Sequence, residues 1–522
     1  MPTLEVIPLD GINRRFPQHR LVGQGGKKAK QYCQQLWNII SLAGKFTKVP
    51  GASRYDSTAR GSQATWAKRI YYEDSGNNKR FLFTVLDNKI YKGDDALGVL
   101  NQVTISTSTQ LSLESGFYPI SATFKTAGTV ATFLVDGKYF YKFNGNAAGD
   151  WERLPIKLDI DGNTVEPIFI CEYLDRLWVL TKQSNVLIGS KNLNPEILND
   201  ATDSILLELP PGNGGFPKGL AVHPNGYLYV IHEDYFVPLS GSSASTFGIR
   251  PGDITKGYGT RASRSIVVFN DSIGFLNSRN NEYYKMNDLQ TPLSYDLQLQ
   301  SLINPVKAND TVCHLDTQLN CLRIAYYPTG GTTLGDEELY SLDEQKWCGQ
   351  TRGRNVSCYS QWDGEGDDGR LLTGRSDTGL IMVNDATFNF DSTPIRIWFI
   401  SASYVASDEL TDVQFEEFYL DARPDGNYVV PVRYYLDARL TNKGEANPSM
   451  QGELYNDGVW QIQIAEQTIF VNRELFYIDY SRGRMIRFEL DWADPDRTLE
   501  FYGMYATYNT QEHKLDKFIG GR

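Results

Sequence analysis

The chain has few of the residues from which metal centres and disulfide frameworks are built. Its 522 residues include six cysteines and five histidines. The cysteines show no Cys-x-x-Cys spacing and the histidines are scattered, so we expect no zinc site. A cross-strand disulfide between Cys313 and Cys321, or between Cys348 and Cys358, is geometrically possible. Buried free thiols are favoured, because reducing compartments disfavour disulfides.

Long apolar runs are also missing from the sequence. No run of about 18 apolar residues occurs, so no membrane-spanning helix is expected. The first residues, MPTLEVIPLDG, lack the basic n-region and the apolar h-region of a secretory signal peptide. We therefore expect the protein to be made, and at least first used, in the cytoplasm.

The composition instead favours a large β-protein of two or more domains. The chain holds 31 Tyr, 25 Phe and 9 Trp together with 46 Gly, which suits many short strands joined by tight turns. The segment Leu174 to Pro195 is a clear example. A turn at Asp175-Arg176 precedes the apolar run Leu177 to Leu180, and a polar turn at Lys182 to Asn185 leads into a second apolar run. Strand, polar turn and strand predict a hairpin.

Within that hairpin we interpret Trp178 as a packing residue, and Asp175 and Arg176 as turn residues rather than catalysts. Similar hairpins recur along the chain. Their predicted turns are Asp87 to Lys89, Asp136 to Lys138, Pro224 to Gly226 and Asn270 to Ser272. The Asp-Gly turn is the strongest signal, because that pair supplies the positive φ angles of a primed turn.

Repeated hairpins of similar size predict an all-β fold with a β-propeller-like domain. At roughly 40 to 50 residues per blade, the first ~385 residues would hold about seven or eight blades. Longer strand-like segments follow, and Met485 to Leu490 alternates between polar and apolar residues as in an antiparallel sandwich. Pro431 places its segment at an edge or a bulge. The predicted domains are a basic N-terminal arm (1–50), the propeller-like domain (51–388) and a β-sandwich with a short polar tail (389–522).

Charge is distributed unevenly along the chain. Residues 1–70 hold twelve Lys or Arg against three acids, a net charge of +9, whereas the whole chain carries −12. A basic arm on an acidic body predicts that the arm docks on an acidic surface. That surface would be a second copy of the chain, another protein or nucleic acid, in this order of preference, and an arm packed on its own acidic domain is an equal alternative. The predicted interface residues are Arg14, Arg15, Arg20, Lys27, Lys28, Lys30, Lys45 and Lys48.

Short motifs offer only weak signals for a ligand or a reaction. Gly23 to Lys28 departs from a phosphate-binding loop, and Asp159 to Asn163 lacks the terminal Glu of a calcium loop. Asp363 to Asp368 favours an exposed turn over a calcium site. Glu172, Asp175, Glu233 and Asp234 lie near strand ends, where acids are common in any β-protein. We therefore predict no catalytic residues, no cofactor and no metal ligands.

Several passages together resemble the propeller-bearing hub or nozzle proteins of short-tailed bacteriophages, known as packaged-DNA stabilisation or tail-accessory proteins. Gly44 to Gly51 is similar to the segment that leads into the first blade of that family. Asp175 to Trp178 with Ser190 to Pro195 is similar to a recurrent "R-L-W... S... N-P" passage, and Tyr340 to Asp343 with Lys346-Trp347 resembles a late blade that closes on Trp.

The resemblance implies a non-enzymatic virion protein of the tail or neck, assembled in the host cytoplasm. It implies a homo-oligomeric ring, with a hexamer favoured, below the portal and adaptor proteins, through which double-stranded DNA passes without sequence recognition. An acidic body suits a conduit wall, because like charge repels DNA phosphates. A virion adhesion protein that binds a host-surface glycan, with Trp362 as one contact, is the alternative, and a propeller enzyme acting on glycans is less favoured.

Overall fold

The computed structural model divides the chain into two compact units, which are described here one at a time. The first, the propeller unit, comprises Ser53–Glu337 and Gly353–Asn384, and the second unit comprises Met1–Ala52, Glu338–Arg352 and Asp385–Arg522. The structure describes residues 3–6, 12–14, 33, 35–74, 77–93, 98–105, 110–113, 117–126, 129–143, 151–154, 165–182, 186–200, 202–210, 217–241, 243–362, 369–401, 404–405, 413–423, 430–436, 444–446, 462–464, 467–469, 472–483, 485–495 and 498–510.

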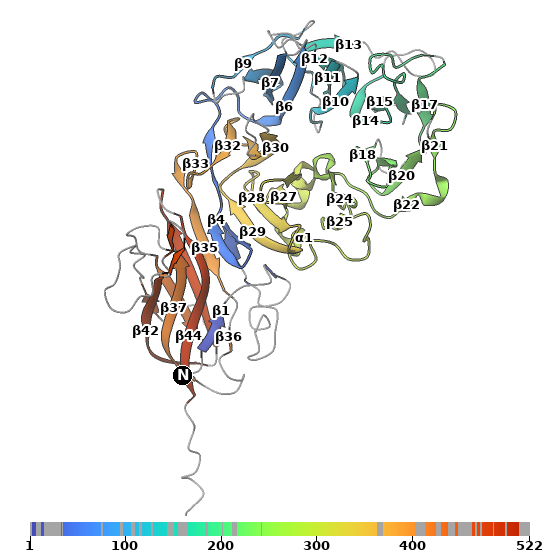
Figure 1. Ribbon diagram of the computed structural model, residues 1–522. Helices are drawn as coiled ribbons and strands as arrows, with labels where there is room; N and C mark the ends of the chain where they lie inside the picture. The colour runs from blue at the N-terminus through green and yellow to red at the C-terminus, as the bar shows by residue number, and fades with distance from the viewer. Residues whose placement is uncertain are drawn as a thin grey trace, which may run out of the picture. The chain divides into compact units, whose positions relative to one another are not determined.

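The propeller unit contains six antiparallel sheets among its described residues, arranged as the blades of a β-propeller (Figure 1). The first strand of a blade lies toward the centre of the ring and the later strands lie outward. Blades one to three consist of β6 (Ala64–Asp74), β7 (Asn77–Leu86), β8 (Lys89–Gly93) and β9 (Asn101–Gln102); β10 (Ile120–Thr126), β11 (Thr129–Val135), β12 (Phe140–Phe143) and β13 (Trp151–Leu154); and β14 (Pro167–Tyr173), β15 (Arg176–Thr181), β16 (Val186–Gly189) and β17 (Ile205–Glu208).

Blades four to six complete the set. They consist of β18 (Gly219–Val222), β19 (Leu228–Ile231), β20 (Tyr235–Ser240), β21 (Gly248–Ile249) and β22 (Thr255–Lys256); β23 (Val267–Val268), β24 (Ile273–Leu276) and β25 (Tyr283–Lys285); and β30 (Val356–Trp362), β31 (Arg370–Arg375) and β32 (Ile381–Asp385). The described chain is only 5% helical. Its helical turns are η2 (Pro251–Asp253), η3 (Ser263–Ser265), α1 (Leu299–Leu302) and η4 (Pro305–Asp310).

The prediction of seven or eight blades was too high. Between β25 and the next strand, residues 286–311 carry α1 and η4 instead of strands. The hairpin of β26 (Val312–Asp316) and β27 (Cys321–Tyr326) then lies between blades five and six, because β26 contacts both β23 and β30. β28 (Asp336–Ser341) begins at the end of the first propeller segment, and its residues from Glu338 onward belong to the second unit. The all-β propeller prediction itself is confirmed.

The predicted hairpins form with the expected turn chemistry. Asp136 is fully buried at the turn between β11 and β12. Its carboxylate accepts the backbone N–H groups of Lys138 at 2.9 Å and Tyr139 at 2.7 Å, and the hydroxyl of Tyr141 at 2.7 Å. Gly137 takes a φ of +92°, a conformation open to glycine at little cost. The Asp-Gly turn is therefore held by its own side chain.

The buried residues join each blade to its neighbour. One cluster unites Trp178 and Leu180 of blade three with Val230 and Val237 of blade four. The Trp178 ring is fully buried, its N–H donates to the Tyr173 carbonyl at 2.9 Å, and its centroid lies 4.3 Å from that of Phe247. The interpretation of Trp178 as a packing residue is thus confirmed.

The ring closes where the two ends of the propeller sequence meet. The Tyr55 N–H donates to the Ile381 carbonyl at 2.8 Å, and Ser357 Oγ hydrogen-bonds to the carbonyls of Ala64 and Gly374. A shared buried cluster containing Leu82 and Leu372 joins blade one to blade six. The segment after Gly44 was expected to lead into the first blade. Instead β5 (Gly51–Arg54) pairs with β32, so it first completes the last blade.

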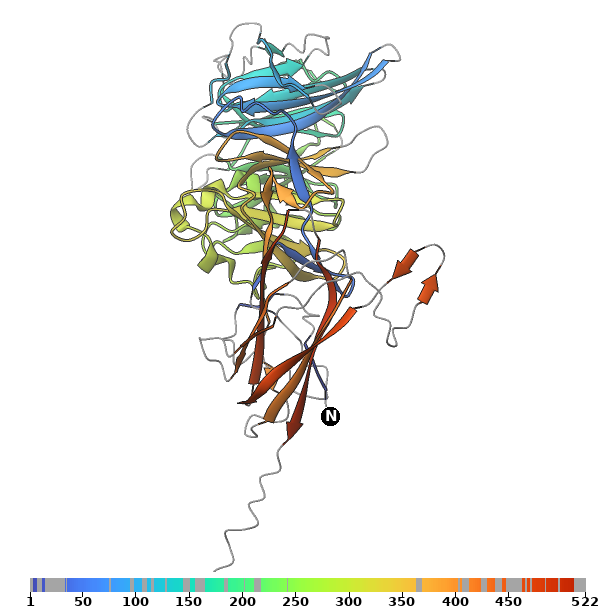
Figure 2. The ribbon, with the colours of Figure 1, turned by 90° about the vertical axis from the view of Figure 1, so that its left-hand side faces the viewer.

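The second unit draws its strands from three separated parts of the sequence. The described strands pair in the order β39-β38-β43-β35-β2-β29-β3-β4-β44-β37-β42, with β1 beside β44 and β36 beside β43. Figure 2 shows the long strands of this unit running alongside one another. The N-terminal and central members are β1 (Thr3–Val6), β2 (Gln35–Trp37), β3 (Ile39–Leu42), β4 (Lys45–Lys48) and β29 (Lys346–Arg352).

The C-terminal part supplies the remaining strands of the second unit. They are β33 (Asn389–Phe390), β34 (Thr393–Pro394), β35 (Arg396–Ile400), β36 (Tyr404–Val405), β37 (Val413–Arg423), β38 (Val432–Leu436), β39 (Gly444–Ala446), β40 (Ile462–Ile464), β41 (Gln467–Ile469), β42 (Asn472–Gly483), β43 (Met485–Ala493) and β44 (Glu500–Thr510). The strand content is as predicted, whereas the β-sandwich stays a prediction.

The boundaries of the two units differ from those drawn on the sequence at 50/51 and 388/389. Residues 51–52 and 385–388 belong to the second unit, as does Glu338–Arg352. The predicted late blade that closes on Trp347 therefore forms part of the second unit, where Tyr340 and Trp347 pack with centroids 5.1 Å apart. The sequence does not indicate that residues 338–352 belong to the second unit, because their local pattern is that of any other hairpin.

Two local patterns in the second unit follow from residue type. Ile486, Phe488 and Leu490 are buried on β43 and Glu489 between them is partly buried, as alternation requires, but Arg487 on the predicted polar face is buried as well. Pro431 lies one residue before β38, which pairs with both β39 and β43. The strand is not at an edge, and the proline is tolerated because it precedes the hydrogen-bonded ladder.

The six cysteines form no disulfide, and five of them are buried. Burial raises the pKa of Cys33 to about 12 and that of Cys358 to about 11, so both remain protonated near neutral pH. In the part of the chain that the structure describes, no helix is long and apolar enough to cross a membrane.

Candidate functional site

A pocket opens near the centre of the propeller, which we call the axial pocket. Its volume is about 280 Å³. The polar and aromatic side chains that matter for its chemistry are Phe117, Tyr118, Lys218, Arg261, Lys307 and Asp310. Each comes from a segment that leads into the innermost strand of a blade or into β26. The propeller geometry therefore brings together residues that are far apart in the sequence.

Tyr118 and Asp310 form a fixed polar pair on one side of the axial pocket. The Tyr118 hydroxyl donates to Asp310 Oδ1 at 2.6 Å. Burial raises the pKa of Tyr118 to about 12, and the neighbouring Asp310 carboxylate acts in the same direction. The phenol therefore stays protonated and remains a donor at physiological pH.

Arg264 holds this pair in place from outside the pocket. Its guanidinium carbon lies 3.4 Å from the centroid of the Tyr118 ring, a cation–π contact. Its two terminal nitrogens donate to the carbonyls of Ser357 at 2.6 Å and Asp310 at 3.0 Å. The arginine thus links blade six, the η4 turn and Tyr118, so the pocket wall is built before any ligand arrives.

Two further cations lie on the side of blade four. Arg261 Nε hydrogen-bonds to Glu233 Oε1, and the Arg261 side chain is 55% exposed. Burial lowers the pKa of Lys218, and the charge of Arg261 lowers it further, against the opposing effect of Glu233. Loss of hydration on burial is the main cause of this lowered lysine pKa.

Lys307 supplies the remaining cation, and its side chain is 49% exposed. Its ammonium nitrogen lies 3.9 Å from Asp310 Oδ2 and 5.6 Å from the centroid of Tyr327. The three lining cations Lys218, Arg261 and Lys307 outnumber the two nearby carboxylates of Glu233 and Asp310. The axial pocket is therefore positive in a chain whose net charge is −12.

The four carboxylates considered as a possible glycan-cleaving set are not brought together. Glu172 and Asp175 flank the turn between β14 and β15, and the Tyr173 hydroxyl there donates to the Gly226 carbonyl in the turn between β18 and β19. Glu233 lies in the next turn of blade four, at the opposite end of its strands, beside Arg261. The two pairs therefore lie at opposite ends of the blades.

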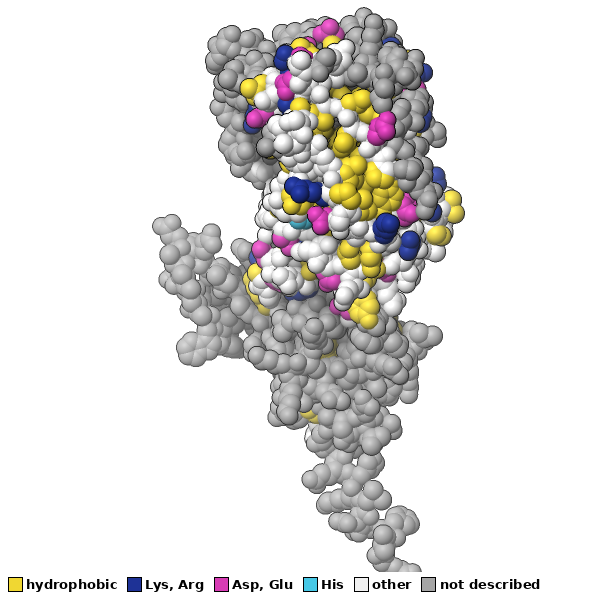
Figure 3. Space-filling model, turned by 90° about the vertical axis from the view of Figure 1, so that its right-hand side faces the viewer, with side chains coloured by type: hydrophobic (Ala, Val, Ile, Leu, Met, Phe, Trp, Pro, Cys, Tyr) yellow, Lys and Arg dark blue, Asp and Glu magenta, His cyan; other side chains and the backbone are white. Residues whose placement is uncertain are grey.

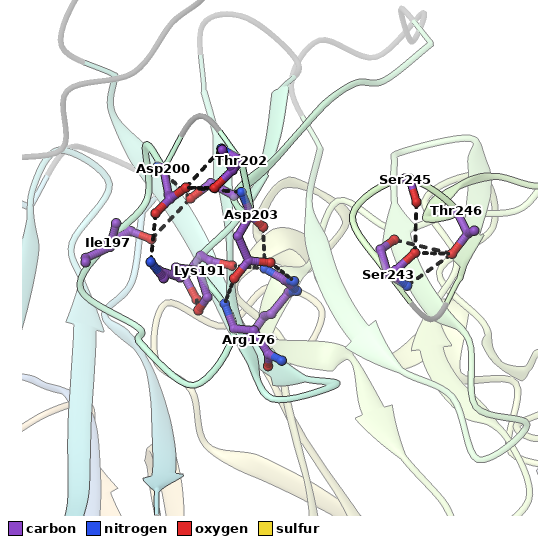
Figure 4. A network of polar contacts seen from close by, with 12 residues as sticks. Arg176, Lys191, Ile197, Asp200, Thr202, Asp203, Ser243, Ser245 and Thr246 are labelled. Atoms are coloured by element: carbon purple, nitrogen blue, oxygen red, sulfur yellow. Dashed lines mark hydrogen bonds and ion pairs between the residues drawn. The ribbon is translucent and has the colours of Figure 1, made fainter.

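Arg176 has a structural role at the edge of blade three (Figure 4). It is the first residue of β15, after a turn at Leu174-Asp175. Its guanidinium donates to the carbonyls of Ser190 and Asp203 and to the Asp203 carboxylate, each at 2.6 Å. Lys191 pairs with Asp200 at 2.9 Å in the same loop. The network ties the loop before β17 to the blade, and Arg176, predicted as a turn residue, instead begins the strand.

The described cations of the predicted arm interface have partners within the second unit. Arg14 pairs with Glu338 at 3.1 Å and also donates to Gln350 at 3.0 Å. Lys45 pairs with Glu500 at 3.2 Å. The Lys48 ammonium donates to the Asp494 carbonyl at 2.8 Å, and burial lowers its pKa to about 8. Arg15, Arg20, Lys27, Lys28 and Lys30 lie outside the described residues.

The weak loop motifs also lie outside the described residues. These are Gly23 to Lys28, Asp159 to Asn163 and Asp363 to Asp368. Trp362 ends β30, and its side chain is not described. Among the residues that are described, no group of three or more His, Cys, Asp or Glu side chains is placed to hold a metal ion.

Comparison with known proteins does not add a family to this geometry. No family model matches the chain, and no curated protein sequence matches it.

Proposed function

We propose that this protein is a structural subunit of a bacteriophage tail, a hub or nozzle component that assembles as a homo-oligomeric ring. The ring, with six copies favoured, would lie below the portal and adaptor and surround the path of double-stranded DNA. The resemblance found in the sequence suggests this role, and the fold class is compatible with it.

The observation that carries the proposal is exposed apolar surface on the propeller unit. On the face seen in Figure 3, hydrophobic side chains gather in a band among scattered charged ones. The exposed large hydrophobic side chains of the propeller unit include Leu193 at 56% and Leu206 at 41%. Contiguous apolar surface of this kind marks protein–protein contacts, and such contacts close into a ring when a rotation relates the copies.

The basic segment before Cys33 supplies a second contact in this proposal. Because Arg14, Lys45 and Lys48 already have partners in the second unit, docking on a neighbouring copy would depend on the other five cations. A head-to-tail ring pairs a basic segment of one copy with an acidic surface of the next. This is the role that the charge asymmetry of the chain predicts.

The test is the oligomeric state of the purified full chain, measured by size-exclusion chromatography with light scattering and by negative-stain imaging. We expect rings. Leu206→Glu should prevent their formation, whereas Glu208→Gln, at a position two residues along β17 on the same face, should not. Reversing Lys27, Lys28 and Lys30 to Glu should also disperse the rings, and reversing the exposed propeller residues Lys125, Lys138 and Lys256 should not. Normal rings from both disruptive variants would refute the proposed contacts.

An adhesion protein that binds a host-surface glycan is the second candidate. The axial pocket favours it, because aromatic and polar side chains line one small cavity. A chain that stays monomeric and binds a saccharide would support adhesion over the ring. Turnover of a polysaccharide would contradict both proposals.

A further inference from the structure

We propose that the axial pocket binds the carboxylate-bearing ring of an acidic sugar, such as a uronic acid residue of a surface polysaccharide. This inference does not depend on ring assembly, and it assigns the propeller a ligand of stated chemistry. Three properties of the pocket carry it: charge, lining chemistry and size.

Charge comes first, because the pocket offers cations that a ligand can reach. Arg261 and Lys307 have side chains about half exposed, and Lys218 is a third cation in the lining of the pocket. The contact of Arg261 with Glu233 uses Nε, so its two terminal nitrogens keep the geometry for a carboxylate. An anionic group entering the pocket replaces water around these cations.

The lining chemistry next favours a sugar over a simple anion. Phe117 and Tyr118 contribute aromatic rings to the lining, and such rings pack against the apolar faces of sugars. Asp310 keeps acceptor capacity beyond its contact with Tyr118, and Asn309 adds an amide. Carboxylate and amide oxygens accept hydrogen bonds from hydroxyl groups, which an acidic sugar carries in addition to its carboxylate.

Asp310 also argues against phosphate as the ligand. A phosphate monoester carries a charge near −2 at neutral pH and donates few hydrogen bonds, so a carboxylate in the wall repels it. A single sugar carboxylate carries one negative charge and can contact the lining cations Lys218, Arg261 and Lys307, with its hydroxyls toward the acceptor oxygens of Asp310. The cations of the pocket therefore match the carboxylate of an acidic sugar, and the Asp310 oxygens match its hydroxyl groups.

The volume of the axial pocket limits how large a bound ligand can be. The volume of about 280 Å³ is at the lower end of small-molecule sites, which span roughly 300 to 1,000 Å³. A single sugar ring fits this volume, and a nucleic-acid duplex does not. The pocket would thus hold one residue of a longer chain.

The experiment is a titration of the full chain with D-glucuronate, D-glucose and inorganic phosphate, followed by ligand-observed NMR and calorimetry. We expect glucuronate to saturate a single site with a dissociation constant of about 1 mM, typical of a small polar ligand. Glucose, which lacks the carboxylate, should bind at least about tenfold more weakly, the effect of roughly one charged contact. Glucuronate binding should weaken as salt is added.

Variants locate the binding site. Lys307→Gln and Lys218→Gln should each weaken glucuronate binding by about three- to tenfold, and the double variant should abolish it. Lys125→Gln is the matched control, because Lys125 is an exposed lysine of β10 near the end of the strand opposite Ile120, which lines the pocket. It should bind as the unchanged chain does. Lys307 is half exposed, so its replacement keeps the test valid even if Lys218→Gln fails to fold.

Several outcomes would overturn the inference. These are the absence of saturable glucuronate binding, glucose binding of equal strength, phosphate binding tighter than glucuronate, or equal loss in Lys125→Gln. Because none of these substitutions alters the predicted ring contacts, Lys307→Gln should still assemble normally. Failure of ring formation and failure of sugar binding are therefore separate results.

Discussion

The propeller unit and the second unit are both almost entirely β, yet they assemble their cores from different ranges of the chain. In the propeller, buried clusters join blades that are consecutive in sequence. In the second unit, Phe46 stacks on Phe501 with centroids 4.5 Å apart, and Lys45 pairs with Glu500, 455 positions later. The core of the propeller is thus formed mainly by blades that follow one another in the sequence, whereas the core of the second unit combines residues from the two ends of the sequence.

The two units also differ in the exposure of an arginine that pairs with carboxylates in each of them. The propeller buries Arg323 completely, with Nε donating to Asp316 at 2.8 Å and a terminal nitrogen donating to Glu337 at 3.3 Å. Tyr359 completes the group by donating to Glu337 at 2.6 Å. In the second unit, the comparable bidentate pair of Arg396 with Asp491 leaves the arginine side chain 62% exposed. The Arg323 group is thus fully buried in the propeller, whereas the Arg396–Asp491 pair lies at the surface of the second unit.

The largest expected effect comes from breaking the buried group. Arg323→Leu leaves two carboxylates buried without their cation, which should lower the free energy of unfolding of the propeller by about 4 kcal/mol. Arg396→Leu removes an exposed pair and should cost less than about 1 kcal/mol. Guanidinium denaturation measures both. Equal losses from the two variants would remove the contrast between the units.

Phe46→Ala should act on the second unit alone. The ring of Phe46 is 1% exposed and also lies 5.8 Å from Phe399, so its truncation leaves a cavity that costs about 3 kcal/mol. Hydrogen exchange read by mass spectrometry should show faster exchange in residues 485–495 and no change in residues 165–182. Faster exchange in both segments would mean that the units do not unfold separately.

Acid pH should lower the free energy of unfolding of the propeller through protonation of His232. Burial lowers the pKa of His232 from its usual 6.5 to about 4, and the charge of Lys218 adds to this effect. Between those two pH values the unfolded chain binds a proton that the folded one does not, so stability is present above pH 6.5 and falls as the pH drops toward 4. The loss should reach about 2 to 3 kcal/mol.

His232→Gln is the variant that isolates this contribution. In melts recorded from pH 7 to pH 4 it should show a shallower decline than the unchanged chain. The matched variant His223→Gln replaces a more exposed histidine and should change the decline less. A pH profile unaffected by His232→Gln would show that other groups control acid sensitivity.

The local hairpins of the propeller could be predicted from the sequence, because turn residues and strand residues alternate within a few positions. Asp136-Gly137 and Asp87-Asn88 are examples, and the latter pair takes φ values of +46° and +67°. The pairing of Trp37 with both Gln350 and Trp398 could not be predicted. No local pattern marks which distant strand a short apolar segment will join.

The axial pocket was also missed, for a related physical reason. Lys218, Arg261 and Lys307 belong to three separate segments and form no motif along the chain. What they share is their place just before the strands near the ring centre. Once hairpins are recognised as blades, the residues that precede each first strand are the positions to inspect. By contrast, the carboxylates near strand ends were visible in the sequence, but they lie at opposite ends of the blades.

The contact between Tyr55 and Ile381 closes the ring of blades, and it can form only late during synthesis on the ribosome. A nascent chain that has emerged only to about residue 350 already holds every residue of blades one to five, but it lacks the strands that close the circle. Until β32 leaves the exit tunnel, blade one has no partner for the apolar side chains, such as Leu82, that later face blade six. Such a chain is open to wrong partners for many seconds, at roughly 5 to 20 residues synthesised per second. The synthesis of β32 thus completes the packing of the first blade.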